Sequence, residues 1–132
     1  MAIEKQVYRV GKLSEALEAG KVPLSPVVRA GDFVFVSGQP PVDQQTGKVE
    51  RMDVAKQTEQ VLENVKLCLE TAGSSLDKVV KCTVYITNAA YFATVNEVYA
   101  RYFPTDPPAR SFVVVGSWPM EFDVEIECVA IG

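Results

Sequence analysis

Arg110 is the residue whose type and position point most directly to chemistry. It follows two prolines and opens an apolar run, 110–115, that is typical of a strand. Because proline lacks the backbone N–H that a sheet ladder uses, we expect the strand to begin just after them. A guanidinium at the mouth of a strand can face a cavity and grip a carboxylate or phosphate through two parallel hydrogen bonds. A structural ion pair with Glu125 or Glu127 explains the same stretch equally well.

Glu125 and Glu127 form a second candidate group near the C-terminal end. The segment 124–131 alternates as a strand, so two carboxylates two residues apart point to the same face. Solvated charges at a sheet edge are the usual explanation of such a pair. Val129 and Ile131 share this face, however, so we do not expect it to lie in open water.

Asn96 is a third candidate because it lies inside an apolar helical stripe. The helix predicted at 88–103 places Phe92 and Tyr99 on the same face. A buried carboxamide without partners costs about 1–3 kcal/mol, so Asn96 must find a hydrogen-bonding group. From spacing alone, a bond to a nearby loop backbone is a slightly better interpretation than a role in a site.

The chain contains no histidine, which removes several kinds of chemistry. Serine–histidine and cysteine–histidine nucleophile pairs are excluded, as are zinc sites built on histidine. A general base must then be a carboxylate, lysine, tyrosine, cysteine or a water held by the backbone. Cys68, Cys82 and Cys128 form no CxxC pair and fall on apolar faces, so we interpret them as buried reduced thiols rather than reactive ones. We expect no metal site.

The composition is that of one globular domain spanning 1–132. Apolar residues make up 48% of the 132 residues and charged residues 23%, which suits a packed core rather than disorder. The net charge of −4 argues against a nucleic-acid partner, since phosphate binding needs clustered lysine and arginine. No apolar run approaches the roughly 20 residues that span a bilayer. The first residues resemble neither a signal peptide nor a transit segment, so we expect a cytoplasmic protein without membrane partners.

The pattern along the chain predicts an α+β fold. Strands are predicted at 7–10, 27–29, 33–36, 79–87, 110–115 and 124–131, and helices at 13–19, 53–72 and 88–103. Asp53 can cap the longest helix, and Gly73 can end it in a left-handed conformation. The two long helices are expected to pack on one face of the sheet. The other face carries Tyr85, Val129 and Ile131, and leaving it bare would expose a large apolar patch, so self-association is predicted.

Four groups of residues form a pattern in order and at compatible spacing. They are Val36-Ser37-Gly38-Gln39, then Val79-Val80-Lys81-Cys82-Thr83-Val84-Tyr85, then Phe92-Ala93-Thr94-Val95-Asn96-Glu97-Val98-Tyr99, and finally Pro108-Ala109-Arg110-Ser111 with Val124-Glu125-Ile126-Glu127. Together they resemble the RidA/YjgF family of reactive-intermediate deaminases. The resemblance implies a chorismate-mutase-like fold of the bacillary type, whose mixed or antiparallel sheet closes with two others into a trimeric barrel. It covers the chain from about 27 onward and leaves the N-terminal segment 1–22 without an assigned role.

The resemblance also implies an activity and the residues that perform it. The reaction is hydrolysis of reactive imines and enamines, of the 2-aminoacrylate and 2-iminopropanoate type, to 2-oxo acids and ammonia, without metal or organic cofactor. By position, Arg110 matches the arginine that grips the substrate carboxylate, and Glu125 matches the acidic residue that orients the attacking water. Ser37 and Gly38 match the strand end that lines the pocket, and Asn96 matches an asparagine in the cleft between subunits of the homotrimer.

Departures from the family pattern predict a reshaped pocket wall. Phe112, which we place among the substrate-binding residues, stands where many members have cysteine or another small residue. The segment 23–30 lacks the tyrosine that often lines the family's pocket, which allows a larger or different enamine, such as an aminomuconate-type compound. Two other functions are alternatives: a non-catalytic trimer that binds small carboxylates or partner proteins, and a ribonuclease or translation inhibitor. The acidic charge and the missing histidine place the ribonuclease last.

Overall fold

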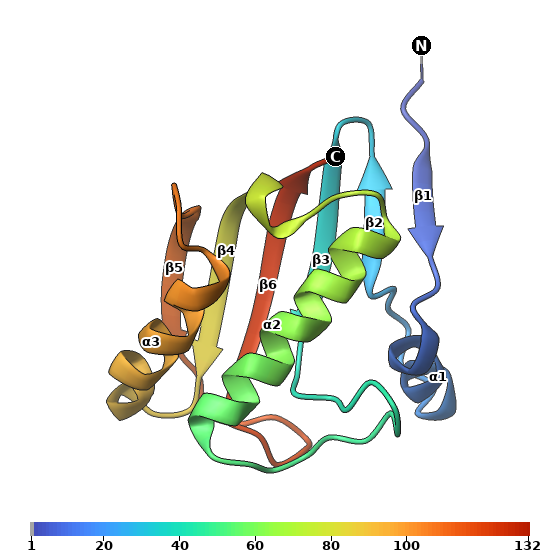
Figure 1. Cartoon of the computed structure of the whole chain (residues 1–132). Coiled ribbons are helices and arrows are strands. Elements are labelled where there is room, and N and C mark those ends of the chain that lie inside the picture. Colours follow the sequence, from blue (N-terminus) through green and yellow to red (C-terminus); the bar gives the residue numbers. More distant parts are fainter. Residues whose placement is uncertain (1) are drawn as a thin grey trace.

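A single six-stranded sheet organises the chain (Figure 1). The computed structural model describes residues 2–132. The strands are β1 (Lys5–Tyr8), β2 (Val27–Ala30), β3 (Phe33–Gln39), β4 (Val79–Ile86), β5 (Ala109–Val114) and β6 (Val124–Ile131), and their order across the sheet is β1-β2-β3-β6-β4-β5. β4 and β5 are parallel, whereas every other neighbouring pair is antiparallel. The prediction of an α+β fold with a mixed sheet is confirmed.

Three α-helices accompany the sheet. They are α1 (Gly11–Ala19), α2 (Val54–Thr71) and α3 (Phe92–Tyr102), and two short 3-10 turns, η1 (Leu76–Lys78) and η2 (Ala89–Tyr91), precede β4 and α3. α2 crosses β6 and β3 diagonally, and α3 lies beside it over β4 and β5 (Figure 1). The two long helices therefore share one face of the sheet, as predicted, and α1 adds Leu13 to the same core. Within residues 2–132, no helix is both long and apolar enough to cross a membrane.

The ends of the long helices follow from local chemistry. Asp53 accepts a hydrogen bond from the backbone N–H of Lys56 at 2.9 Å, which satisfies one of the free donors of the first turn of α2. Gly73 follows α2 with φ at +81°, a conformation that favours glycine. Asn88 accepts a hydrogen bond from the backbone N–H of Ala90 at 2.9 Å, and the turn η2 then leads into α3. The caps predicted for α2 at Asp53 and Gly73 are confirmed, whereas the Asn88 side chain caps η2 and not α3.

The two faces of the sheet differ in what covers them. The face under α2 and α3 forms the core, where the paired strands β4 and β6 bury their alternate apolar residues completely or nearly so. On the opposite face, Phe33, Phe35, Val113 and Ile131 keep between 39% and 47% of their surface exposed. Exposed aromatic and aliphatic side chains in adjacent strands are typical of a surface that binds another protein.

The three cysteines lie in the core, as predicted. Cys68 of α2, Cys82 of β4 and Cys128 of β6 are free thiols with at most 3% of their surface exposed. Burial raises the pKa of each thiol, that of Cys68 to about 12. A thiol that is both buried and protonated is a poor nucleophile.

We therefore expect the three thiols to resist a thiol-specific reagent in the folded protein at mildly alkaline pH. All three are expected to react at once after denaturation, because the unfolded chain exposes them and restores their ordinary pKa. Mass spectrometry of the intact chain counts the modified thiols under both conditions. A cysteine that reacts in the folded protein as fast as a free thiol would contradict the interpretation of these residues as inert core groups.

Candidate active site

Arg110 lies on β5 and points to the helix-covered side of the sheet. It pairs in register with Cys82, which is buried in the core, so both side chains lie on that face. Its half-buried side chain makes no hydrogen bond or ion pair with any residue in the described part of the chain. The guanidinium carbon lies instead 4.8 Å from the ring centroid of Tyr99, 5.1 Å from that of Phe112 and 5.8 Å from that of Phe92. All five guanidinium N–H donors are therefore available to a ligand.

The helix α3 supplies much of the surroundings of this arginine. Phe92, Asn96 and Tyr99 are three or four residues apart, so they share one helical face. The Phe92 ring meets the Phe112 ring edge-on, with 4.7 Å between centroids. Phe92 was predicted to be buried, and that prediction was wrong: 46% of its surface is exposed. The reason is its position at the first residue of α3, over β5, which is an edge strand of the sheet.

Two buried polar atoms on this face of α3 lack a hydrogen-bond partner among the described residues. They are Asn96 Oδ1 and Tyr99 Oη. No loop backbone satisfies the Asn96 oxygen, contrary to the interpretation that spacing alone favoured. Burial raises the pKa of Tyr99, and the nearby Cys82 thiol adds to this, so the hydroxyl stays protonated. The orphaned Asn96 oxygen calls for a ligand or a water, whereas the Tyr99 hydroxyl has the Cys82 thiol beside it. We refer to Arg110, Phe112, Phe92, Asn96 and Tyr99 as the arginine half-site.

Glu125 lies on the opposite face of the sheet. It pairs with Tyr85 of β4, three residues from Cys82, so its side chain points away from the helices. The carboxyl is half-buried, and burial raises its pKa above the ordinary value of 4.5; the charge of Glu127 raises it further, while a hydrogen bond with Trp118 lowers it. Such a carboxyl exchanges protons closer to neutral pH than a solvated glutamate does.

Gly38 packs directly against this carboxyl. A Cβ atom at Gly38 would lie 2.5 Å from Glu125 Oε2, so any larger residue would push the carboxylate out of its position. The pairing of β3 with β6 is irregular between Val36 and Gln39. These two residues are three positions apart in β3, but their partners Cys128 and Ile126 are two positions apart in β6, so β3 contains one extra residue. Bulges of this kind are common next to functional sites because they change where the backbone and side chains point.

Ser37 fastens the loop that follows α1 to the end of β3. Its hydroxyl donates to the Ser25 carbonyl at 2.6 Å, and its backbone N–H donates to the Pro26 carbonyl at 2.9 Å. The hydroxyl oxygen can still accept a hydrogen bond from a ligand. We refer to Ser37, Gly38, Trp118 and Glu125 as the glutamate half-site.

The two half-sites lie on opposite faces of one sheet. Arg110 is on the face of Cys82, and Glu125 is on the face of Tyr85. The alternative interpretation of Arg110, an ion pair with Glu125 or Glu127, is therefore wrong. Glu127 instead accepts a hydrogen bond from the Tyr85 hydroxyl. A single chain cannot bring Arg110 and Glu125 to the same small molecule.

Two cavities in the described part of the chain lie elsewhere. One, of about 260 Å³, lies between β1, α1 and the loop 22–26, and another, of about 280 Å³, lies at the C-terminal end of α3. Neither is lined by Arg110 or Glu125. In the part of the chain that the structure describes, no three His, Cys, Asp or Glu side chains are grouped so that they could hold a metal ion.

Sequence reasoning missed two buried amides that hold the loops around the glutamate half-site. Gln57 Nε2 donates to Asp123 Oδ2 at 3.0 Å, and Gln57 Oε1 accepts from the Asp123 backbone N–H at 2.8 Å, just before β6 begins. Asn64 Nδ2 donates to the carbonyls of Pro40 and Val42, at 3.1 and 2.9 Å, just after β3 ends. Both amides are fully buried. Their helical spacing with the apolar residues of α2 is the signal that could have revealed them.

Comparisons with known proteins show what the chain is similar to. A family model described as Endoribonuclease L-PSP matches residues 14–132. The protein named Reactive Intermediate Deaminase A, chloroplastic, of Arabidopsis thaliana is 40% identical over 129 residues, which are 98% of this chain and 67% of that protein. The crystal structure of YyfA of Yersinia pestis, described as a protein of unknown function of the conserved Rid family, has a TM-score of 0.89 and 38% identity, and the match covers 98% of this chain and all of that one.

A further solved structure contains a small molecule. The crystal structure of E. coli TdcF with bound serine has a TM-score of 0.78 and 42% sequence identity, and the match covers 83% of this chain and 88% of that chain. Serine carries the α-carboxylate that a guanidinium recognises through paired hydrogen bonds.

Proposed function

The chain belongs to the Endoribonuclease L-PSP family, which includes the Rid proteins, and from this premise we propose that it hydrolyses reactive imines and enamines derived from small 2-amino acids. The substrates are of the 2-aminoacrylate and 2-iminopropanoate type, and the products are a 2-oxo acid and ammonia. The name of the Arabidopsis relative supports this reaction class. No metal or organic cofactor takes part in the proposed reaction.

The observation that carries the proposal is the free guanidinium of Arg110. A half-buried arginine with no hydrogen-bond or ion-pair partner among residues 2–132 and three rings around it is suited to receive an anion. The substrate carboxylate takes two parallel N–H donors of Arg110. The orphaned Asn96 Oδ1 then accepts a hydrogen bond from the imine N–H of the substrate, which would give that buried oxygen the partner it lacks.

Glu125 activates a water and transfers protons in the proposed mechanism. The substrate reacts as the protonated imine. The Glu125 carboxylate takes a proton from a water as the water oxygen bonds to the imine carbon and the second carbon–nitrogen bond breaks, its electron pair passing to nitrogen, which gives a neutral carbinolamine. The protonated Glu125 then returns that proton to the nitrogen. The carbon–nitrogen bond breaks, ammonia leaves, and the Glu125 carboxylate accepts the hydroxyl proton and passes it to solvent, which leaves the 2-oxo acid. An imine carbon is already electrophilic, so no stronger nucleophile is needed. A pKa raised by burial suits a group that must act as base and then as acid.

The two half-sites meet, in this proposal, between neighbouring subunits of a homotrimer. They lie on opposite faces of the sheet, so the arginine half-site of one subunit must face the glutamate half-site of another. The exposed apolar face of the sheet supports such an assembly, because Phe33, Phe35 and Ile131 would be buried inside it. A barrel of three sheets with the helices outside, of the chorismate-mutase type, satisfies both requirements.

An assay with freshly generated imines tests the function. An amino-acid oxidase converts alanine or 2-aminobutanoate to the imine, and trapping with semicarbazide reports how much imine remains with and without the protein. We expect the protein to accelerate imine loss and the release of ammonia. An unchanged decay of every imine tested, including larger enamines, would refute the proposal.

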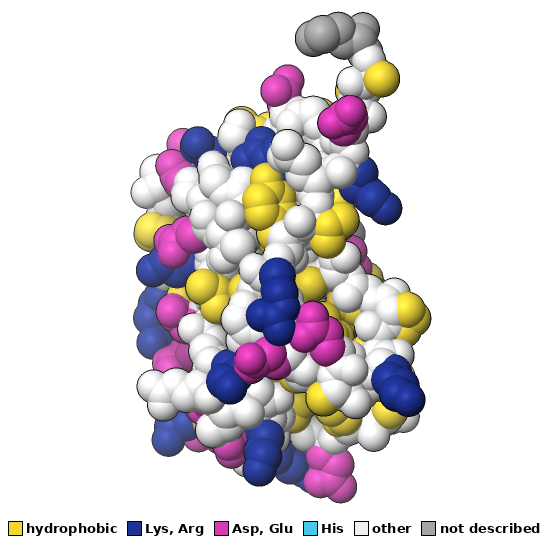
Figure 2. Space-filling model, turned by 90° about the vertical axis from the view of Figure 1, so that its right-hand side faces the viewer, with side chains coloured by type: hydrophobic (Ala, Val, Ile, Leu, Met, Phe, Trp, Pro, Cys, Tyr) yellow, Lys and Arg dark blue, Asp and Glu magenta, His cyan; other side chains and the backbone are white. Residues whose placement is uncertain are grey.

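The same assay separates the other candidate functions. A non-catalytic carboxylate binder would bind 2-oxobutanoate without accelerating imine loss. The name of the family model prompts a parallel measurement with RNA. Two features argue against RNA cleavage: the net charge of −4, and the mixture of basic and acidic side chains on the face shown in Figure 2. Cleavage of RNA by the pure protein, with no effect on imines, would reverse the order of the candidates.

Neutralising Glu127 is expected to move the acidic limb of the kcat/KM profile to lower pH. Glu125 must be charged to accept a proton from water, and its pKa is raised by burial first and by the charge of Glu127 second. In Glu127→Gln the second contribution disappears, so the pKa of Glu125 falls and the active form persists in more acidic solution. Initial rates of imine hydrolysis across the acidic range at low substrate concentration measure the limb of the free enzyme.

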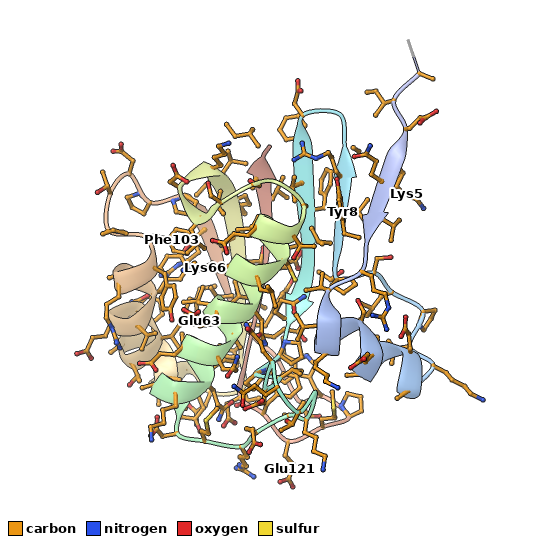
Figure 3. The ribbon with its side chains drawn as sticks, turned by 45° about the vertical axis from the view of Figure 1, so that its right-hand side comes forward. Lys5, Tyr8, Glu63, Lys66, Phe103 and Glu121 are labelled. Atoms are coloured by element: carbon orange, nitrogen blue, oxygen red, sulfur yellow. The ribbon has the colours of Figure 1, made fainter. Side chains whose placement is uncertain are left out.

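Glu121→Gln is the matched control for this shift. Glu121 is exposed and pairs with Arg51 at 3.2 Å, and it is not among the groups that shift the pKa of Glu125 (Figure 3). This variant changes the net charge by the same amount and is expected to leave the limb in place. A limb that moves to higher pH in Glu127→Gln, or does not move, would show that a group other than Glu125 sets it.

A further inference from the structure

An arginine that binds a small anion must itself be held in place. A carboxylate or a carbonyl can fix an arginine, but it then uses some of the arginine's donors. Arg110 has no such partner in residues 2–132, so its position depends on packing. Three aromatic rings can provide this packing, because a guanidinium is attracted to the face of an aromatic ring. They are those of Tyr99, Phe112 and Phe92.

Tyr99 is the most firmly placed of the three rings. Its ring centroid is the nearest to the guanidinium carbon, at 4.8 Å, and 6% of its surface is exposed, against 46% for Phe92. Phe103, which follows the last turn of α3 (Figure 3), packs on Tyr99 with 4.7 Å between ring centroids. Phe103 is buried as well. The ring of Tyr99 is therefore backed by the core, whereas that of Phe92 borders solvent.

The hydroxyl of Tyr99 contributes little to this arrangement. Tyr99 Oη makes no hydrogen bond of ordinary geometry with the described residues, although the Cys82 thiol lies nearby. The contact with Arg110 runs through the ring. Building on the function proposed above, we infer that Tyr99 is a positioning residue that holds the Arg110 guanidinium in place for a carboxylate, and that it acts through its ring.

The position of the guanidinium can be read directly by NMR. The Nε–H resonance of Arg110, assigned with Arg110→Lys, is expected to be displaced by the ring current of Tyr99. In Tyr99→Leu the resonance moves toward the position of a free arginine, whereas in Tyr99→Phe and in Phe103→Leu it stays near its original position. Phe103→Leu is the matched control, because it removes a ring from the same core but not from the guanidinium. If Tyr99→Leu does not fold, Tyr99→Met fills more of the volume without a ring and replaces it.

Binding of 2-oxobutanoate gives the second readout. We expect its Kd to rise about 3–30-fold in Tyr99→Leu and to stay within about twofold in Tyr99→Phe, with kcat changing less than KM in both. An unchanged resonance and Kd in folded Tyr99→Leu would overturn the inference. So would an equal loss in Tyr99→Phe, which would assign the role to the hydroxyl, or in Phe103→Leu, which would indicate general damage to the core. If the wild-type protein neither binds 2-oxobutanoate nor hydrolyses imines, the proposed function fails, and the Arg110 resonance alone decides the positioning role.

Discussion

Replacing Arg110 with alanine is expected to lower kcat/KM for 2-iminopropanoate hydrolysis by about 10²–10⁴-fold. The variant loses two charge-assisted hydrogen bonds to the substrate carboxylate, each contributing about 1.5–3 kcal/mol. The folded chain should tolerate the change, because Arg110 makes no hydrogen bond or ion pair within residues 2–132 and its removal orphans no partner. Initial rates with oxidase-generated imine measure the loss, and thermal unfolding with size-exclusion chromatography measures fold and assembly.

Two further variants decide what the arginine contributes. Arg110→Lys keeps the charge but loses the planar guanidinium with its paired N–H donors, and it is expected to be little more active than Arg110→Ala. Arg101→Ala, also on the α3 side, removes an exposed arginine that pairs with Glu59 at 3.2 Å and is expected to keep full activity. Full activity in Arg110→Ala would remove the carboxylate grip from the mechanism. Activity restored by lysine would show that charge matters and the paired geometry does not.

The elements that the sequence predicted best are those whose signals are local. The helix α2 has an apolar stripe at helical spacing, a capping side chain at Asp53 and a left-handed glycine at Gly73, and all three lie in one continuous segment. From Cys82 to Ile86 the strand β4 alternates between its two faces. These features depend on backbone geometry within a few residues, so they could be predicted without knowing the partners.

Features that depend on distant partners were harder to predict. Gln57 and Asn64 are polar residues in the buried face of α2, and their side chains form hydrogen bonds with loop residues that are distant in the sequence. Phe92 has the spacing of a core residue, but it lies over an edge strand, which depends on strand order. The extra residue in β3 near Gly38 exists only relative to the register of β6.

In the candidate site, too, some features depend on local sequence and others depend on distant partners. The sequence could identify Arg110 and Glu125 as candidates, since their residue types and strand positions are local facts. Whether they form an ion pair depends on the register of β5 and β6 against β4, which no single segment contains. The structure gives that register, and it places the two side chains on opposite faces. The alternative of an internal ion pair is removed for this reason.

Mixing two inactive variants is expected to restore activity if the site lies between subunits. Arg110→Ala keeps an intact glutamate half-site, and Glu125→Gln keeps an intact arginine half-site; each alone is expected to lose about 10²–10⁴-fold. In a mixed trimer, a Glu125→Gln subunit can face an Arg110→Ala subunit and supply its arginine to the other's glutamate. Random assembly from equal amounts gives about a quarter of all sites both intact residues, and about one site in three in the trimers that contain both variants. Co-expression with two different affinity tags, followed by tandem purification, provides the mixed trimers for the imine assay.

A second mixture distinguishes a shared site from a complete site in each subunit. When wild-type chains are mixed equally with the double variant Arg110→Ala/Glu125→Gln, a site contained in one subunit keeps about half of the activity, because half of the chains are intact. A site shared by two subunits keeps about a quarter, because both neighbours must be intact. The opposite faces of Arg110 and Glu125 predict the second value. Retention of half of the activity, together with no recovery when the single variants are mixed, would mean that each subunit holds a complete site, and the proposed division of labour between half-sites of neighbouring subunits would be wrong.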